Sequence, residues 1–245
     1  MKQLNHIAAG AVLGLSAIAA STAHAGFVVS AQSGSGALTL CADNSSCDAN
    51  ALEGVINTTV SAFGGYDFVI EISQTYPALG SPGMPILRLT TIGNSDLSGT
   101  SNTTPLTLRT TQTGFTLAGM AMFDLSSAIN FPALPESTAP IANADFRYYL
   151  DNDNVEFGMT TLLGSVGFDY TNPLASAQSD NRIAMATPDG SFSLTNQIVL
   201  NGIDANRGIS LNAAVSATVP EPASLALVGA ALLGLGFSRR RGNPA

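Results

Sequence analysis

The chain is divided into short runs of apolar and β-branched residues, and Gly, Pro, Asn, Asp or Ser closes nearly every run. Runs of five to ten residues separated by turn-forming residues are typical of strands joined by tight connections. The pattern therefore predicts an all-β body, a single β-sandwich of jelly-roll or immunoglobulin-like type. The expected strands are 27–31, 67–73, 86–92, 105–110, 115–123, 144–150, 155–162, 165–170, 182–187, 191–200 and 208–218.

Between these runs, the residue types predict turns, loops and one helix. The segments 151–154 and 188–190 are rich in Asp, Asn, Pro and Gly and predict tight turns. Longer connecting loops are expected at 77–85, 94–104 and 131–140. A helix is expected at 49–63, where apolar residues recur near helical spacing and Asp48 is placed to cap the first turn.

The first 25 residues have the features of a secretory signal peptide. Lys2 lies in a short polar start, an apolar run follows at 7–20, and Ala23-His24-Ala25 provides the small residues that signal peptidase accepts. Cleavage after Ala25 is expected to leave Gly26 as the first residue of the mature chain. The alternative is a buried N-terminal helix.

Residues 219–245 combine three unlike elements. These are the joint Pro220-Glu221-Pro222, the uncharged segment 223–237 and the cluster Arg239, Arg240 and Arg241. The prolines stiffen the joint, and the segment would span about 22 Å as a helix, less than the roughly 30 Å apolar core of a bilayer. Because clustered arginines stay on the cytoplasmic side, the precursor is expected in the inner membrane with its bulk outside, held by a short transmembrane helix.

In this order and position, the three elements resemble a PEP-CTERM sorting tail. The resemblance implies recognition by an exosortase, a membrane-embedded cysteine protease-transpeptidase that cuts near the Pro-Glu-Pro and releases the protein or transfers it to the cell exterior. It also implies a Gram-negative bacterium that makes exopolysaccharide. The chain then divides into a signal peptide (1–25), a mature domain (26–218) and a sorting tail (219–245). An ordinary C-terminal anchor helix is the alternative.

The predicted mature domain is acidic and lacks several catalytic residue types. It carries five basic and sixteen acidic residues, a net charge of −11, so we expect no nucleic acid partner. Lys2 is the only lysine of the chain, His6 and His24 are the only histidines, and there is no Trp. The mature domain therefore cannot build a Ser-His-Asp triad, a Cys–His pair, a His-ligated zinc site or a lysine Schiff base.

Carboxylate chemistry stays open, because glycoside hydrolysis needs only two acids. No motif singles out a pair, however, and without Trp the usual stacking platform for sugars is missing. Tyrosine can take that place, and the candidates are Tyr66, Tyr76, Tyr148, Tyr149 and Tyr170. We expect no catalytic residue and no enzyme activity, with a carboxylate-dependent glycosidase as the least favoured alternative.

Cys41 and Cys47 are the only cysteines of the chain. In an exported protein, an isolated pair at this spacing predicts a disulfide that closes a short loop. The alternative is a redox or metal site, although the spacing is not that of the usual redox motif.

Asp151, Asp153, Asn154 and Glu156 bring several oxygen ligands into one loop, and Asp145 lies upstream. Oxygen clusters of this kind suit Ca²⁺, so Asp151, Asp153 and Glu156 are the candidate calcium ligands. The loop lacks the Gly and the later Glu of an EF-hand, and a solvated turn favours the same residues. No other cofactor is expected.

These features predict an exported, exosortase-processed, non-enzymatic protein of the cell surface or extracellular matrix, associated with exopolysaccharide in a biofilm. The expected partners are signal peptidase, exosortase and the inner membrane during processing, and afterwards exopolysaccharide. A carbohydrate- or calcium-binding module is the second interpretation.

The mature protein recovered from its host is expected to end near Pro220-Glu221-Pro222 and to lack the apolar segment 223–237. The reason is that a segment too short to be a comfortable permanent anchor suits a transient one that is cut away. Intact mass and sequencing of the C-terminal peptide test this. A mature chain that keeps the segment would identify it as an ordinary anchor.

Overall fold

The computed structural model describes residues 26–36, 38–61, 63–95, 102–117, 119–130, 143–169, 177–203 and 208–219. The predicted signal-cleavage residues Ala23 and Ala25 lie outside this part of the chain. So do the predicted sorting residues from Pro220 to Arg241. The boundaries at 25/26 and 218/219 therefore stay predictions, as does the short transmembrane helix.

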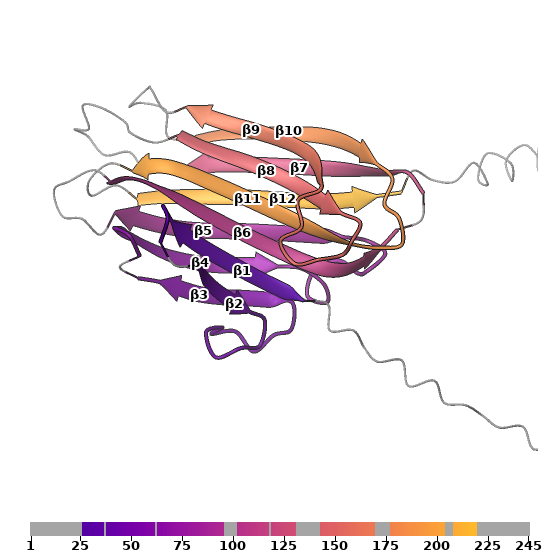
Figure 1. The fold of residues 1–245 in the computed structure, drawn as a ribbon, viewed down its shortest axis with the longest axis horizontal. Helices are drawn as coiled ribbons and strands as arrows, with labels where there is room; N and C mark the ends of the chain where they lie inside the picture. The colour runs from indigo at the N-terminus through magenta and orange to yellow at the C-terminus, as the bar shows by residue number, and fades with distance from the viewer. Residues whose placement is uncertain are drawn as a thin grey trace, which may run out of the picture.

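The described residues form two six-stranded antiparallel sheets packed face to face (Figure 1). The first sheet has the order β2-β1-β6-β11-β8-β9, and the second β10-β7-β12-β5-β4-β3. The strands are β1 (Phe27–Ser33), β2 (Thr39–Ala42), β3 (Val55–Val60), β4 (Tyr66–Gln74), β5 (Ile86–Ser95), β6 (Asn102–Thr116), β7 (Ala121–Asn130), β8 (Asn143–Asp151), β9 (Thr161–Asp169), β10 (Ala177–Ala186), β11 (Ser191–Ile203) and β12 (Gly208–Thr218). The predicted all-β sandwich is confirmed.

Alternating side chains build the core between the sheets. In β7, every second residue from Ala121 to Ile129 is buried, and the residues between them are more exposed, because successive side chains point to opposite faces of a strand. Strand β11 differs, since Phe192 to Ile198 are all buried. Its inner face packs on the second sheet and its outer face is covered by the loop 152–160, whose Val155 carbonyl accepts a hydrogen bond from Ser193 Oγ at 2.8 Å.

Polar side chains inside the sandwich bond across it, from one sheet to the other. Tyr148 Oη of β8 donates to the Ser126 carbonyl of β7 at 2.6 Å. Asn196 Nδ2 of β11 donates to the Leu87 carbonyl of β5 at 3.1 Å. Tyr66 Oη of β4 donates to the Thr104 carbonyl of β6. Because a buried polar group without a partner is costly, these contacts favour one alignment of the two sheets.

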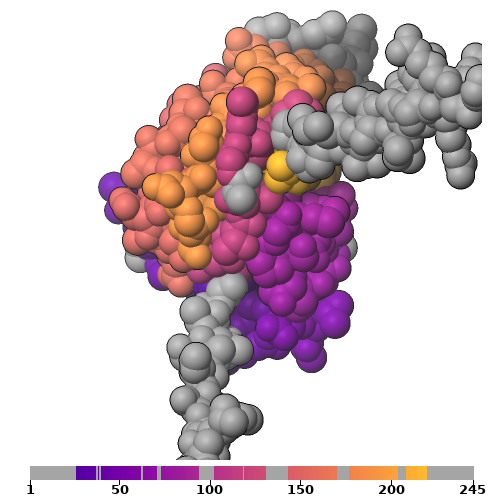
Figure 2. All heavy atoms as spheres, turned by 90° about the vertical axis from the view of Figure 1, so that its right-hand side faces the viewer, coloured from indigo at the N-terminus to yellow at the C-terminus, as the bar shows by residue number. Residues whose placement is uncertain are grey.

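Both ends of the described chain lie at the same end of the sandwich. Phe27 at the start of β1 pairs with Gln112 near the end of β6, and Thr218 at the end of β12 pairs with Met122 at the start of β7. A short connection joins β6 to β7, which brings the two ends together. Figure 2 looks onto this end, where β12 finishes in yellow.

The expected helix at 49–63 is wrong. This region holds a turn followed by strand β3. Gly54 adopts a positive φ of 81° that ends the turn, and β-branched residues then dominate β3, whose Val55 and Ile56 are buried. Such residues suit a pleated sheet better than a helix, and their spacing by itself did not distinguish the two.

Two expected strands and one expected loop also differ from the structure. The run 115–123 is split between the end of β6 and the start of β7 by a connection containing Gly119 at a φ of 80°. The run 155–162 is mostly loop, with Phe157 at a φ of 55°, and β9 begins only at Thr161. The connection expected at 94–104 is shorter in the structure, because β5 extends to Ser95 and β6 begins at Asn102.

The remaining turn predictions agree with the structure where it describes them. The segments 77–85 and 188–190 lie between strands. Asp151 ends β8 and a turn follows it. The expected connector 131–140 lies outside the described residues.

Replacing Gly93 with Ala is expected to destabilise the sandwich by about 1–3 kcal/mol, because overpacking displaces core side chains. A β-carbon at Gly93 would lie 2.3 Å from two ring carbons of Phe68. Gly83→Ala is the matched control, since the nearest atom to its β-carbon would be 3.8 Å away, and it should be nearly neutral. Urea unfolding of the three proteins measures the difference, and equal midpoints would contradict this packing.

The stability of the protein is expected to fall as the pH rises from about 10 to about 12. Burial raises the pKa of Tyr148 to about 12, whereas an unfolded tyrosine titrates near 10. The stabilisation that protonated Tyr148 gives the folded state is therefore complete below pH 10. On the order of 2 kcal/mol of the free energy of unfolding is lost as the pH rises through the folded pKa. Chemical denaturation at several pH values measures this. Tyr148→Phe should weaken the dependence, and Tyr149→Phe, on the outer face of β8, should not.

Candidate functional site

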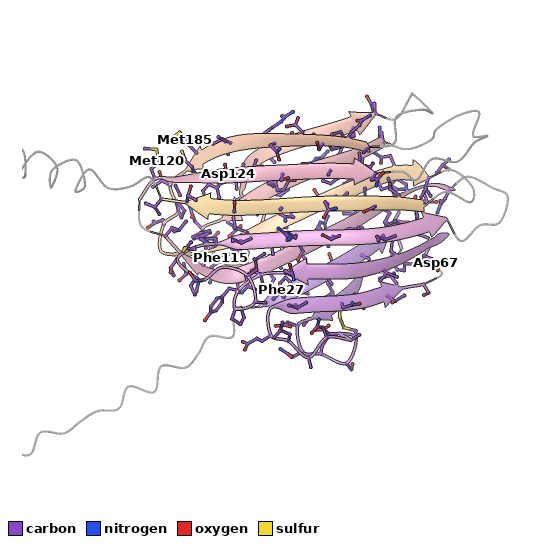
Figure 3. All side chains as sticks on the ribbon, turned by 180° about the vertical axis from the view of Figure 1, so that it is seen from behind. Phe27, Asp67, Phe115, Met120, Asp124 and Met185 are labelled. Carbon is purple, nitrogen blue, oxygen red and sulfur yellow. A yellow bond between two sulfur atoms is a disulfide. The ribbon has the colours of Figure 1, made fainter. Side chains whose placement is uncertain are left out.

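A groove of about 840 Å³ opens at the end of the sandwich where β1 begins. The polar and exposed side chains that line it are three acids, two amides and one tyrosine: Asp43, Glu53, Glu156, Asn44, Asn154 and Tyr76. Tyr76 is 37% exposed. No Arg or Lys is among the described residues that line the groove. In Figure 3, Phe27, which also lines the groove, lies near Phe115, while Asp67 lies at the opposite end of the molecule.

Backbone hydrogen bonds hold the wall that carries Tyr76. The loop 75–85 turns back on itself, with the Leu79 amide donating to the Thr75 carbonyl at 2.8 Å. Its far half is tied to both sheets, because the carbonyl of Pro82 accepts from Thr116 of β6 at 2.8 Å and that of Pro85 accepts from Ala217 of β12 at 2.9 Å. The groove is therefore attached to the strand that leads into the sorting tail.

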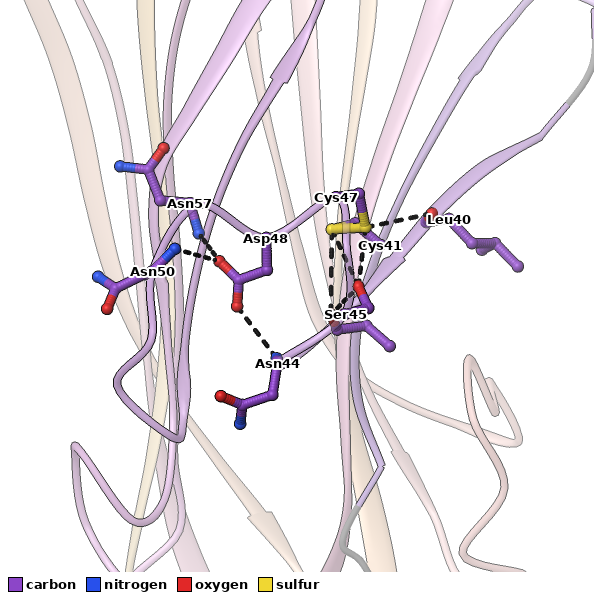
Figure 4. Close-up of a disulfide and its surroundings, with 9 residues drawn as sticks. Leu40, Cys41, Asn44, Ser45, Cys47, Asp48, Asn50 and Asn57 are labelled. Carbon is purple, nitrogen blue, oxygen red and sulfur yellow. Dashed lines mark hydrogen bonds between the residues drawn. A yellow bond between two sulfur atoms is a disulfide. The ribbon is translucent and has the colours of Figure 1, made fainter.

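The disulfide loop forms the second wall (Figure 4). The predicted bond between Cys41 and Cys47 is present, with 5.7 Å between the two Cα atoms. Asp48 follows the bridge and accepts backbone hydrogen bonds from Asn44 at 3.2 Å, Asn50 at 2.9 Å and Asn57 at 3.0 Å. The disulfide and the backbone hydrogen bonds to the Asp48 carboxylate together fix the loop that presents Asp43 and Asn44 to the groove.

Asp43 is the carboxylate whose environment is most unusual. Burial raises its pKa, and the negative charges of Asp48 and Glu53 add to the effect. The Gly54 amide donates to Asp43 Oδ2 at 2.8 Å and acts in the opposite direction. Its other carboxylate oxygen is buried and accepts no hydrogen bond. A carboxyl group of this kind holds a proton to a higher pH than an exposed one.

The third wall is the acidic loop that the sequence singled out for calcium. Asp151 is buried and its Oδ1 accepts from the Asp153 amide at 2.8 Å. Asn154 Oδ1 accepts from the Gly114 amide at 2.7 Å, while Glu156 lies beside Gly26 in the groove. Asp145 pairs instead with Arg147 at 3.8 Å.

The calcium site stays a prediction that these contacts do not strengthen. Asp151 and Glu156 face different neighbours, and within the described ranges no three His, Cys, Asp or Glu side chains lie close enough to hold a metal ion. If the loop bound Ca²⁺, Asp151, Asp153 and Glu156 would have to rearrange.

Of the five tyrosines that could stack on a sugar, the four that the structure describes lie in different environments. Tyr66 and Tyr148 are fully buried, Tyr149 is half-buried on the outer face of β8, and Tyr170 lies outside the described residues. Tyr76 alone of the four described tyrosines lines the groove. No signal in the sequence singled out Asp43 and Glu53, since they meet Tyr76 only through the pairing of distant strands.

The predicted sorting residues, Pro220 to Arg241, lie outside the described part of the chain, which ends at Val219. In the stretches that it does describe, we found no helix with the length and apolar character needed to cross a membrane.

Comparison with known proteins gave no curated relative. Among solved structures, a carbohydrate-binding module of lichenase 5A from Cellvibrio mixtus, in complex with cellotriose, is 10% identical with a TM-score of 0.25, over 68% of this chain and 88% of that one. The enzymatically active domain of tailspike protein 4 from bacteriophage CBA120 is 12% identical with a TM-score of 0.26, over 63% of this chain and 19% of that one. Similarity at this level assigns no function to the chain.

The C-terminal region gives a specific match. The family model described as the PEP-CTERM protein-sorting motif matches residues 218–241. The matched range contains the Pro-Glu-Pro joint, the apolar segment and the arginine cluster. The protein therefore carries a PEP-CTERM sorting motif at its C-terminal end, which marks it as an exported protein sorted by exosortase.

Proposed function

We propose that the protein, once released from its sorting tail, is a non-enzymatic component of the cell surface or extracellular matrix of a Gram-negative bacterium and binds exopolysaccharide. The observation that carries this proposal is the groove that holds an exposed tyrosine among carboxylates and amides. The sorting motif accounts for export, and the groove accounts for what the exported domain does there.

The groove has the size and chemistry for a few sugar residues. Ligand sites commonly enclose about 300–1,000 Å³, and the groove volume of about 840 Å³ falls within that range. The ring of Tyr76 offers an apolar surface for the face of a sugar. The carboxylates of Asp43, Glu53 and Glu156 accept hydrogen bonds from hydroxyl groups, and charged acceptors make the stronger bonds.

Charge selects a neutral polysaccharide. The groove is lined by three acids and no described basic residue, and the mature domain carries a net charge of −11. A polymer rich in carboxylate, sulfate or phosphate would be repelled. Because binding to a neutral polymer does not depend on ion pairing, moderate salt should change it little.

A carboxylate-dependent glycosidase is the second candidate, and one observation favours it. Asp43 has a raised pKa and shares the groove with Glu53 and Glu156. Glycoside hydrolysis uses two carboxyl groups, of which one, the general acid, has a raised pKa. Release of reducing sugar distinguishes this activity from binding alone.

Tyr76→Ala is expected to weaken binding to neutral exopolysaccharide by up to about tenfold, because an aromatic contact contributes about 0.5–1.5 kcal/mol. Retention of the mature protein on immobilised exopolysaccharide from its host, on dextran and on the anionic polymer polygalacturonate measures affinity and charge preference. Tyr76→Phe keeps the ring and should bind nearly as well as the native protein.

Tyr149→Ala, on the outer face of β8, is the control for nonspecific loss of an aromatic ring and should leave retention unchanged. Retention that Tyr76→Ala leaves unchanged would exclude the groove as the site, and absence of retention on any neutral polymer would refute the binding function. Reducing sugar released by the native protein, and not by Asp43→Asn, would favour the glycosidase.

A further inference from the structure

Gly26, the predicted first residue of the mature chain, lies in the groove next to Glu156. A β-carbon on Gly26 would lie 2.5 Å from Glu156 Oε1, so covalent geometry places that oxygen within about 5 Å of the Gly26 nitrogen. The Gly26 nitrogen donates to Thr113 Oγ1 at 2.8 Å, and the Gly26 carbonyl accepts from the Thr113 amide at 3.2 Å. The start of the chain is therefore held against β6.

Contacts on either side of Glu156 hold its backbone over this position. The carbonyl of Val155 accepts from Ser193 Oγ at 2.8 Å, and the amide of Phe157 donates to Thr111 Oγ1 at 3.2 Å. Within the part of the chain that the structure describes, the two ion pairs join other residues and leave Glu156 free of an arginine partner. Glu156 is exposed and lines the groove.

Removal of the signal peptide changes the chemistry of the Gly26 nitrogen. In the precursor this nitrogen is a neutral amide, whose single N–H is already donated to Thr113. After cleavage it is an ammonium group with three N–H donors, so two remain for other acceptors. A positive charge is then placed in a groove lined by Asp43, Glu53 and Glu156.

We propose that cleavage after Ala25 creates an α-ammonium group that binds the carboxylate of Glu156, so that part of the acidic groove is a binding site for the chain's own N-terminus. Signal peptide removal then completes the mature groove by adding its one positive charge. This inference is independent of polysaccharide binding and of the sorting tail. It requires only that the mature chain begins at Gly26.

The composition of the protein provides a direct measurement. Lys2 is the only lysine and belongs to the predicted signal peptide, so the α-amine of Gly26 is the single primary amine of the mature chain. Mature protein is purified after export from its host, and N-terminal sequencing establishes its first residue. It is then acetylated at pH 7.5 with an N-hydroxysuccinimide ester, folded and in denaturant, and the modified fraction of the tryptic peptide 26–88 is followed by mass.

Folded native protein is expected to react at least about fivefold more slowly than folded Glu156→Gln, because pairing keeps the amine protonated and covered. Glu53→Gln is the matched control, since it removes the same charge from the same groove, and its rate should stay near that of the native protein. In denaturant all three should react alike. Thermal unfolding of each variant establishes that it is folded.

Equal rates for folded native protein and Glu156→Gln would overturn the pairing, and equal acceleration by Glu53→Gln would replace it with a general effect of charge. A mature chain that begins elsewhere than Gly26 would overturn it too. Should Glu156→Gln fail to fold, the native protein alone decides, since the same rate folded and in denaturant contradicts a bound ammonium group. Loss of polysaccharide retention with a protected amine would refute only the proposed function.

Discussion

Burial of two apolar sheet faces against each other is the interaction on which the rest of this structure depends. Strands β7, β8 and β12 alternate between buried residues on their inner face and more exposed residues on their outer face, which is the pattern of a sheet with one side in a core. Hydrogen bonds from Tyr148 and Asn196 cross this core from one sheet to the other. Burial provides the driving force, and these directional bonds favour the alignment in which the Tyr148 hydroxyl and the Asn196 Nδ2 group each reach a carbonyl of the other sheet.

The groove is a consequence of that alignment. Three segments between the strands supply its acids, its amides and Tyr76: residues 43–54, which follow β2 and include most of the disulfide loop, the loop 75–85 and the loop 152–160. Each is tied to the sheets by specific bonds, such as those of Pro82 with Thr116 and of Val155 with Ser193. Loops held in this way by a rigid scaffold are the usual place for binding residues. Because the β6–β7 connection brings both ends of the described chain to this region, the groove also lies near the point where β12 leads into the sorting tail.

The groove and the predicted mature domain are both acidic. Residues 26–218 carry a net charge of −11, which disfavours binding to anionic polymers. Three of these acids, Asp43, Glu53 and Glu156, line the groove, where we propose that they accept hydrogen bonds from hydroxyl groups or from an ammonium group. The described residues next to the two predicted cleavage points, Gly26 and Val219, belong to the same end of the sandwich. We therefore expect the chemistry at that end to differ between precursor and mature protein.

The sequence by itself determined what depends on contiguous residues: the all-β class, most strand positions, the disulfide between Cys41 and Cys47, and the sorting motif, which is read from a continuous segment. It misjudged β3, because apolar residues at mixed spacing fit a helix until Gly54 and β-branched residues are weighed against it. Only the tertiary structure decided that Tyr76 is exposed while Tyr66 is buried, and that Glu156 turns toward Gly26. The physical reason is that antiparallel pairing brings distant segments together, and the register that does so is set by the whole core.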